Sequence, residues 1–388
     1  MKKQSNFLKN LKSAPLAICF FGFLFGFMIL DMAWPKREKS ELENRPLEQV
    51  PAFSWQSLFK NEWTQKYDKY VKDQVAFRDQ WINLRARAEY FQAKTENNEI
   101  IFGQDSAGTM MFTKFYSLGK NESTYRSNAD AVARFAERHP DKVSFMLTPS
   151  ASVVYSDKLP IGIPLADENY YLDEIFSITG KSAQNFDLRT IFEENKEDYI
   201  FYRTDHHWTT YGAYLAYQEF CSQNGLTPFD LSAHEAVEVP DFYGTSYSRS
   251  RLWNAVPDIL TYYPLDNPMT VEVTGELKPP NDKTDGTMYN LKALDTKDKY
   301  ACFLWGNNGY STIKGDGEGS ILVIKDSYGN SFIPFLTENY EKIGVIDFRY
   351  WKSNIEELAN EYDKILILHN FQTFYQDNGI RKLNLNVQ

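Results

Sequence analysis

The sequence predicts an α/β protein in which helices flank a parallel sheet, with a transmembrane helix near the N-terminus. Three observations lead to this prediction. Short β-branched runs alternate with helical stretches from residue 142 onward, the last third has a β-α-β-α-β pattern, and 18 uncharged residues lie near the N-terminus. Of the 388 residues, 43% are hydrophobic and 16% aromatic, which excludes a largely disordered protein.

The N-terminal apolar run is residues 13–30. As a helix it would extend about 27 Å, close to the hydrocarbon thickness of a bilayer. The lysines before it favour a cytoplasmic N-terminus, although basic residues after it weaken the asymmetry. Those before it are Lys2, Lys3, Lys9 and Lys12, and those after it are Lys36, Arg37 and Lys39. A signal peptide is the main alternative and a core helix a lesser one, but the cleavage pattern around residues 31–34 is poor. We expect residues 1–34 to be a cytoplasmic tail and single-pass anchor in the cell membrane, with the rest extracytoplasmic.

The charge is distributed unevenly, with +5 in residues 1–39 and −15 in the rest of the chain. An acidic body without clustered Lys and Arg excludes a nucleic-acid partner. The three cysteines, Cys19, Cys221 and Cys302, have no metal-binding spacing. We expect buried free thiols, with a Cys221–Cys302 disulfide as the alternative.

The elements follow in order. Residues 35–60 mix proline and charge and read as a linker, and the apolar spacing of residues 62–95 predicts two helices joined near Ala76. The runs 143–147, 199–202 and 321–324 predict strands buried on both faces. The C-terminal pattern predicts strand 320–325, helix 328–338, strand 343–348, helix 353–361 and strand 364–369. We therefore expect one catalytic domain over residues 61–388, with a β-rich insertion at about 240–300.

Ligands of parallel sheets bind beyond the carboxyl ends of the strands, so the chemistry is expected there. Asp205 and His207 stand between a predicted strand and a helix, where the carboxylate can fix the imidazole tautomer. Ser327 follows another strand and opens a predicted helix, whose N–H groups and positive end stabilise negative charge. The three residues suggest a Ser-His-Asp triad with an acyl-serine intermediate.

Other interpretations of these residues stay open. Asp205 can be a helix cap beside a buried histidine, and Ser327 a simple N-cap. Asp205, His206 and His207 are also competent metal ligands, as in manganese phosphoesterases, but the early strand ends in Thr-Pro-Ser without the further aspartates those enzymes need. We expect no metal. A polysaccharide-binding scaffold without activity is the non-enzymatic alternative.

Two segments carry a family resemblance: YRTDHHWTTYGAY at 202–214 and VIKDSYGNSFIPFL at 323–336. They resemble the DHHW proteins of Gram-positive bacteria, relatives of the alginate O-acetylation proteins AlgJ and AlgX, which are similar to SGNH hydrolases. The likeness extends to residues 43–47, 73–79, 306–308 and 347–351.

The resemblance implies an SGNH-hydrolase-like fold with permuted motif order. In it Asp205 and His207 form the Asp-x-His pair, Ser327 is the nucleophile, and His206 only intervenes. Pro149-Ser150 corresponds to an early substrate segment, but Ala151 stands where the alginate proteins have a basic residue.

The implied function is a membrane-anchored O-acetyltransferase acting on a cell-surface or secreted polysaccharide. It would bind no cofactor and receive the acetyl group from a multipass membrane O-acyltransferase. A polysaccharide acetyl esterase with the same triad is the rival, because water could replace the sugar hydroxyl.

The oxyanion and substrate contacts are a separate prediction. The backbone N–H of Ser327 or Tyr328 could face the oxyanion, with a second donor from Gly306, Asn307 or Asn370, of which we favour Asn307. Candidate sugar contacts are Tyr247, Arg249, Arg349 and Tyr350; surface ion pairs and core packing are the alternative roles for them.

Overall fold

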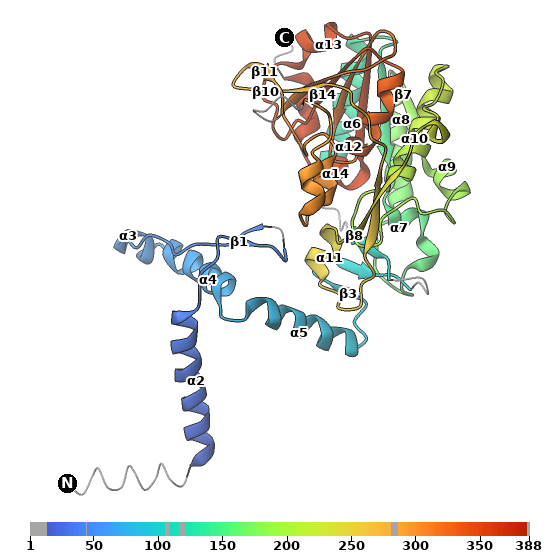
Figure 1. The fold of residues 1–388 in the computed structure, drawn as a ribbon. Helices are drawn as coiled ribbons and strands as arrows, with labels where there is room; N and C mark the ends of the chain where they lie inside the picture. The colour runs from blue at the N-terminus through green and yellow to red at the C-terminus, as the bar shows by residue number, and fades with distance from the viewer. Residues whose placement is uncertain (1–13, 44, 105–108, 116–121, 281–285, 386–388) are drawn as a thin grey trace, which may run out of the picture. The chain divides into compact units, whose positions relative to one another are not determined.

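The computed structural model describes residues 14–43, 45–104, 109–115, 122–280 and 286–385 (Figure 1). It divides into two compact units, Met1–Gln92 and Ala93–Gln388. The sequence prediction started the catalytic domain at residue 61, whereas helices α4 (Glu62–Gln74) and α5 (Arg78–Phe91) fall in the first unit.

The first unit opens with the apolar helix α2 (Pro15–Ala33), whose mean hydropathy is 2.2. By length and composition α2 suits a membrane anchor or a signal sequence. The four lysines expected to hold the N-terminus in the cytoplasm lie outside the described residues. The two helices predicted around Ala76 are confirmed, since α4 ends at Gln74 and α5 begins at Arg78.

The predicted linker, residues 35–60, contains regular secondary structure and is hydrogen-bonded to α4. It contains the hairpin β1 (Lys39–Ser40) and β2 (Arg45–Pro46) and the helix α3 (Trp55–Phe59). Arg45 contacts both oxygens of Asp73, at 2.6 and 2.9 Å, and this hydrogen-bonded pairing lowers the pKa of Asp73. Arg45, which belongs to the family resemblance, therefore fixes the chain against α4.

The second unit is built on an eight-stranded sheet of order β11-β10-β12-β14-β13-β15-β6-β7. Its strands are β6 (Val143–Thr148), β7 (Gln184–Asp187), β10 (Met269–Val273), β11 (Glu276–Lys278), β12 (Tyr310–Lys314), β13 (Ser320–Lys325), β14 (Lys342–Ile346) and β15 (Lys364–Asn370). β14, β13, β15, β6 and β7 pair parallel with one another in that order, whereas β12 pairs antiparallel with β14, and β10 pairs antiparallel with β12 and β11. The predicted α/β class and the mostly parallel sheet are confirmed.

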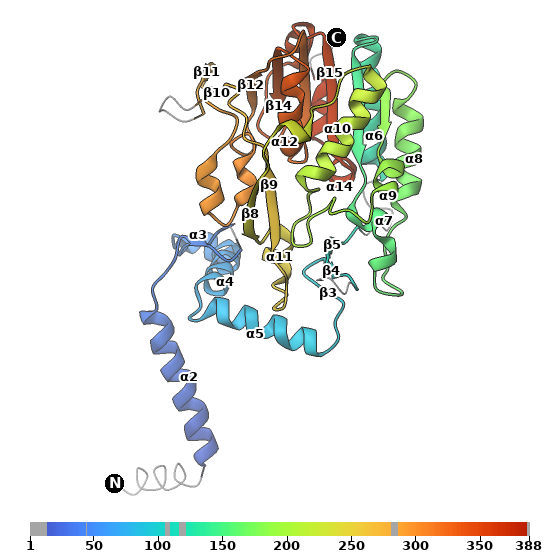
Figure 2. The ribbon, with the colours of Figure 1, turned by 45° about the vertical axis from the view of Figure 1, so that its right-hand side comes forward.

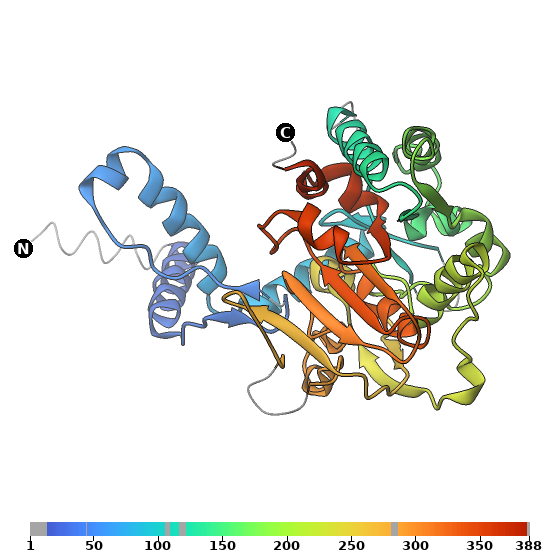
Figure 3. The ribbon, with the colours of Figure 1, turned by 90° about the horizontal axis from the view of Figure 1, so that it is seen from above.

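Helices cover both faces of this sheet, as Figure 3 shows from above. Along β13, Ile321 and Val323 pack on the side of α10 (Thr210–Asn224), whereas Leu322 and Ile324 pack on the side of α6 (Glu122–Arg138). The continuous apolar run of this strand therefore reflects burial on two faces.

The other helices are short except for α8 (Glu168–Thr179). They are α7 (Ala151–Val154), α9 (Arg189–Glu194), α11 (Thr245–Ser250), α12 (Gly329–Phe332), α13 (Ile355–Asn360) and α14 (Phe371–Gln376), with 3-10 turns η1 (Ser156–Lys158), η2 (Leu231–Ala233), η3 (Leu291–Asp295), η4 (Lys299–Cys302), η5 (Ile333–Glu338) and η6 (Gly379–Asn384). Two small antiparallel sheets are formed by β3 (Glu96–Asn97), β4 (Ile100–Phe102) and β5 (Met111–Thr113), and by β8 (Val237–Phe242) and β9 (Asp258–Tyr262). Figure 2 shows α10 beside α12. Ser327 precedes α12 in the chain.

Two predicted elements differ in the structure. Residues 199–202 are no strand of the sheet and make the isolated bridge Phe201–Trp208, because the Ile200 N–H bonds to the Asp198 carbonyl and the Tyr202 N–H to the His207 carbonyl. The predicted helix 328–338 divides into α12 and η5, since Pro334 has no N–H for the ladder and its ring obstructs an α-helix. The C-terminal order β13-α12-β14-α13-β15 is otherwise as predicted.

The region predicted as an insertion is partly integrated into the main sheet. β10 and β11 extend the sheet by antiparallel pairing beyond β12. Cys221 and Cys302 are buried free thiols, as expected from the sequence, and burial raises the pKa of Cys221 to about 11. The disulfide alternative is not formed.

Candidate active site

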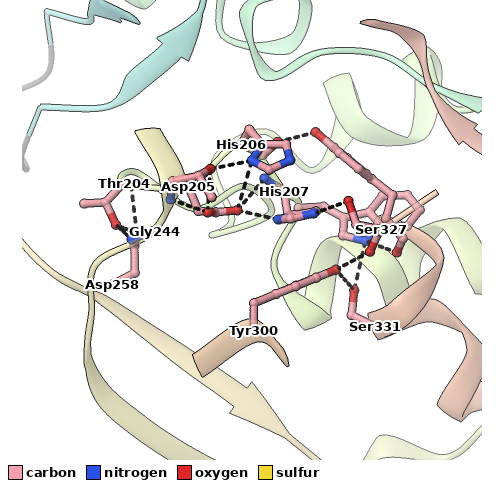
Figure 4. Close-up of polar contacts among 12 residues, drawn as sticks. Thr204, Asp205, His206, His207, Gly244, Asp258, Tyr300, Ser327 and Ser331 are labelled. Atoms are coloured by element: carbon pink, nitrogen blue, oxygen red, sulfur yellow. Dashed lines mark hydrogen bonds and ion pairs between the residues drawn. The ribbon is translucent and has the colours of Figure 1, made fainter. Parts of the chain in front are cut away.

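Ser327, His207 and Asp205 are brought into one hydrogen-bonded row (Figure 4). Ser327 follows the end of β13, and the other two lie in the loop before α10. His207 Nε2 is 2.8 Å from Ser327 Oγ, and His207 Nδ1 is 2.5 Å from Asp205 Oδ1. His207 and Asp205 are buried, whereas Ser327 is partly exposed. The row can pass a proton from the serine hydroxyl to the imidazole.

Asp205 is fixed by four donors. His207 N–H and Nδ1 contact its Oδ1, while the Thr245 N–H and hydroxyl contact its Oδ2 at 2.7 and 3.0 Å. Burial alone would raise the pKa of Asp205, but the histidines and these hydrogen bonds outweigh it and hold the pKa below its ordinary value. Asp205 is therefore a buried carboxylate, charged at neutral pH.

Gly244 leaves the space that the hydrogen-bonded Asp205 carboxylate needs. A Cβ on Gly244 would lie 2.2 Å from the Cβ of Asp205, so no larger residue fits without moving the carboxylate. The Gly244 N–H also donates to the hydroxyl of Thr204, which in turn contacts Asp258. The segment that carries Asp205 is thus tied to β9 through Asp258.

Tyr300 supports the imidazole from one side. Its ring stacks on His207, with centroids 4.0 Å apart and planes 11° apart. Its hydroxyl donates to the carbonyl of Ser327 at 3.1 Å. Burial raises the pKa of Tyr300 well above its ordinary value, so the phenol stays neutral. The sequence analysis missed Tyr300, Thr245, Gly244 and Asp258, which no motif singled out.

Two of the predicted oxyanion donors are already engaged. The Tyr328 N–H donates to Asp326 at 2.9 Å, and the Asn370 side-chain amide donates to Asp326 and Thr373. These two predictions are corrected, because the N–H groups already have acceptors. Asn307, which we favoured, accepts a hydrogen bond from the buried Lys325 on its side-chain oxygen at 2.9 Å, and its role as a donor stays a prediction. The Ser327 N–H has no partner among the described residues and can face an oxyanion.

Three of the four predicted sugar contacts, Tyr247, Arg249 and Arg349, pack against or pair with other side chains of the protein. Tyr247 packs against Tyr243, with ring centroids 4.5 Å apart. Arg349 pairs with the buried Asp347 at 2.5 Å. Tyr350 is 56% exposed and Arg249 pairs with Glu99 at 2.6 Å; of the four residues, Arg249 lines the cleft described next.

A polar cleft of about 680 Å³ adjoins the triad at His206. Its described lining residues are Glu96, Glu99, Thr113, Lys114, His206, Thr245, Ser246, Arg249, Asn370, Gln372, Thr373 and Gln376. The charged ones form two ion pairs, Lys114 with Glu96 and Arg249 with Glu99, both at 2.6 Å. The described lining is therefore polar and close to electrically neutral.

Ser150, from the predicted early substrate segment, lies near the same place. It lines a small cavity with Asp205, His206, Tyr328 and Asn370 among others, and its N–H donates to Glu168 at 2.6 Å. Burial raises the pKa of Glu168 to about 7, and its second oxygen has no hydrogen-bond partner among the described residues.

Glu168→Gln is expected to stabilise the protein above pH 7. The pKa of Glu168 in the folded state exceeds its unfolded value, so the native state retains a proton that the unfolded chain releases. Stability therefore falls between about pH 4.3 and pH 7. The variant should remove this fall and gain up to about 3 kcal/mol at pH 8. Denaturant unfolding at pH 5 and pH 8 checks this, and an equal effect at both values would contradict it.

A metal site was the alternative at this position. Donor atoms of Asp205, His206 and His207 lie within 4.8 Å of one another. Among the described residues, no fourth His, Cys, Asp or Glu side chain belongs to this group. Both ring nitrogens of His207 are already in contact, with Asp205 and Ser327. This donor set is smaller than a manganese phosphoesterase requires and fits the hydrogen-bonded row better.

Comparison with known proteins finds a family that this region resembles. Residues 167–346 match the family described as DHHW protein. Over this region, just under half of its length, the chain is similar to the DHHW family. No curated protein matches the chain.

Solved structures share the fold of this protein. A DHHW family protein from Eubacterium siraeum is 22% identical, with a TM-score of 0.66, covering 74% of this chain and 96% of that one. PatB1 of Bacillus cereus, in a structure with a sulfonyl adduct, is 18% identical, with a TM-score of 0.57, covering 72% and 97%. The O-acetyltransferase domain of Pseudomonas putida AlgJ is 16% identical, covering 72% and 93%; its TM-score of 0.44 supports no conclusion about this chain.

The four residues that name the DHHW family have different environments. Trp208 is fully buried, and its indole N–H contacts the Tyr328 carbonyl at 3.1 Å and the Ser331 hydroxyl at 2.9 Å. This tryptophan holds the turn after Ser327, whereas Asp205 and His207 join the row. His206 remains 35% exposed at the cleft.

Proposed function

We propose that this protein is a membrane-anchored, extracytoplasmic O-acetyltransferase that modifies a cell-surface or secreted polysaccharide. The observation that carries the proposal is the uninterrupted row from Ser327 Oγ to His207, at 2.8 Å, and on to Asp205, at 2.5 Å. A serine, a base and an orienting carboxylate at these distances are the parts that acyl transfer needs.

The first half of the reaction acylates Ser327. His207 Nε2 takes the proton of Ser327 as Oγ bonds to the carbonyl carbon of the donor, and the Ser327 N–H stabilises the oxyanion. The donor's leaving group departs with the proton from His207. Asp205 holds the ring and balances its positive charge while His207 carries both protons.

The second half transfers the acetyl group to a sugar. A sugar hydroxyl gives its proton to His207 and attacks the acyl carbon, and the bond to Ser327 Oγ breaks as Oγ recovers the proton. The polar cleft beside His206 supports a carbohydrate acceptor, because its described lining offers hydroxyl, amide and paired ionic groups.

The donor side of the proposal rests on the anchor and on the family resemblance. Helix α2 would fix the protein at the membrane surface with its active site outside the cytoplasm. A multipass membrane O-acyltransferase would supply the acetyl group there, so the protein itself would bind no cofactor.

Product analysis tests the transferase against its rival. The full chain in detergent micelles is incubated with a chromogenic acetyl ester and a neutral oligosaccharide, and acetylated sugar and free acetate are measured. The proposal expects acetylated oligosaccharide. Free acetate alone would identify an esterase, and no ester cleavage at all would favour the scaffold without activity.

A further inference from the structure

Two imidazoles share one carboxylate at this site. The rings of His206 and His207 lie next to each other, with centroids 3.9 Å apart and planes tilted by 38° (Figure 4). His207 is bound to Asp205 directly through Nδ1, and His206 Nδ1 lies 2.6 Å from the hydroxyl of Thr245, which contacts Asp205 at 3.0 Å. Each histidine is therefore fixed through Nδ1, directly or by way of one hydroxyl.

The hydrogen count of this arrangement determines the tautomer of His206. Ionised Asp205 has no proton to give, so the single hydroxyl proton of Thr245 goes to Asp205. The Thr245 oxygen must then accept from His206, which places the proton of His206 on Nδ1 and leaves an electron pair on Nε2. Desolvation and the neighbouring His207 also lower the pKa of His206 to about 4, which keeps Nε2 unprotonated.

That electron pair is accessible. The side chain of His206 is 35% exposed, against 6% for His207. Within the part of the chain that the structure describes, Nε2 of His206 has no hydrogen-bond partner, nor is it among the buried polar atoms. His206 also lines the polar cleft, so a molecule in that cleft can reach this imidazole.

We propose that His206 Nε2 binds a second hydroxyl group of the acceptor, beside the hydroxyl that attacks acyl-Ser327. This inference rests on the proposed function and specifies its acceptor as a molecule with adjacent hydroxyl groups, such as an uncharged sugar. The attacking oxygen bonds to the acyl carbon and its proton passes to His207, while the bond to Ser327 Oγ breaks and Oγ takes that proton. No bond of His206 changes; it positions the acceptor.

The two adjacent rings favour a diol for a geometric reason. Water or a simple alcohol can use the Nε2 of only one histidine, whereas neighbouring hydroxyls of one sugar can use both. The paired charges of the cleft lining favour an uncharged acceptor over a polyanion, since the cations there already have carboxylate partners.

The test compares 1,2-ethanediol with ethanol at equal hydroxyl concentration. The full chain in micelles receives p-nitrophenyl acetate, and the two acetate esters are measured by gas chromatography. We expect wild type to prefer the diol by about tenfold, the factor that one additional hydrogen bond to the acceptor would give. His206→Asn should reduce this preference to near one while a p-nitrophenol burst is retained, because the asparagine can still contact Thr245 but lacks a group at the Nε2 position.

Two further variants sharpen the result. His206→Gln places an amide near the lost Nε2 and should recover part of the diol preference. His234→Asn is the matched control, since His234 pairs with Glu338 and is absent from the cleft lining. Thermal unfolding of each variant verifies that its fold is retained.

Several results would overturn the inference. These are the same diol preference in His206→Asn as in wild type, no preference in wild type, or a parallel loss of burst and of transfer to both alcohols. The last would show that His206 only supports the triad. Absence of any burst in wild type would instead refute the proposed function, and the inference with it.

Discussion

Ser327→Ala is expected to abolish acyl transfer while the protein stays folded. The variant removes the oxygen that lies 2.8 Å from His207 Nε2 and leaves no other nucleophile in the row. We expect the turnover of a chromogenic acetyl ester to fall by about 10⁴-fold to 10⁶-fold, as when the serine of such a triad is removed. The rate of p-nitrophenol release measures this directly.

The matched control lies at the other end of the same strand. Ser320 begins β13, and its hydroxyl bonds to Asp363 at 2.7 Å. Ser320→Ala should keep near-normal turnover. Equal activity in Ser327→Ala and Ser320→Ala would remove Ser327 from the mechanism.

Asp205→Asn is expected to have the second largest effect. The carboxylate accepts from four donors, two on each oxygen, and an amide has only one accepting oxygen. Whichever way the amide turns, an N–H group must face another donor, either His207 or Thr245. His207 would then lose its tautomer or its orientation, and turnover should fall by about 10³-fold to 10⁴-fold.

A carboxylate at another strand end serves as the control. Asp187 ends β7 and pairs with Arg189 at the surface. Asp187→Asn should leave turnover unchanged. If Asp205→Asn retained full turnover with intact folding, His207 would not depend on the carboxylate and the triad assignment would be wrong.

The sequence predicted which side chains meet because the rule involved is topological. Ser327 follows a strand whose apolar run is unmistakable, and the C-terminal β-α-β-α-β order is nearly as predicted. The predicted contact between His207 and Ser327 is present even though residues 199–202 form no strand. The position of the Asp-x-His loop depends on Asp258 and Trp208, contacts distant in sequence.

The predictions from sequence were wrong where the role of a residue depends on its hydrogen-bond partner in the folded protein. Tyr328 and Asn370 have N–H groups of the right chemistry for an oxyanion site, but Asp326 accepts hydrogen bonds from both. Tyr300 stacks on His207 from a 3-10 turn with no periodic pattern. Such pairings are properties of packing, which residue type and spacing do not encode.

The central claim, that Ser327 carries the acetyl group, is tested most directly by peptide mass spectrometry. The full chain is mixed with p-nitrophenyl acetate, quenched in acid during the burst, digested and sequenced. The account predicts one acetyl group on the hydroxyl of Ser327 in wild type and none at this position in Ser327→Ala. Burst-phase protein that carries its acetyl group on another residue, or none on Ser327, would contradict it.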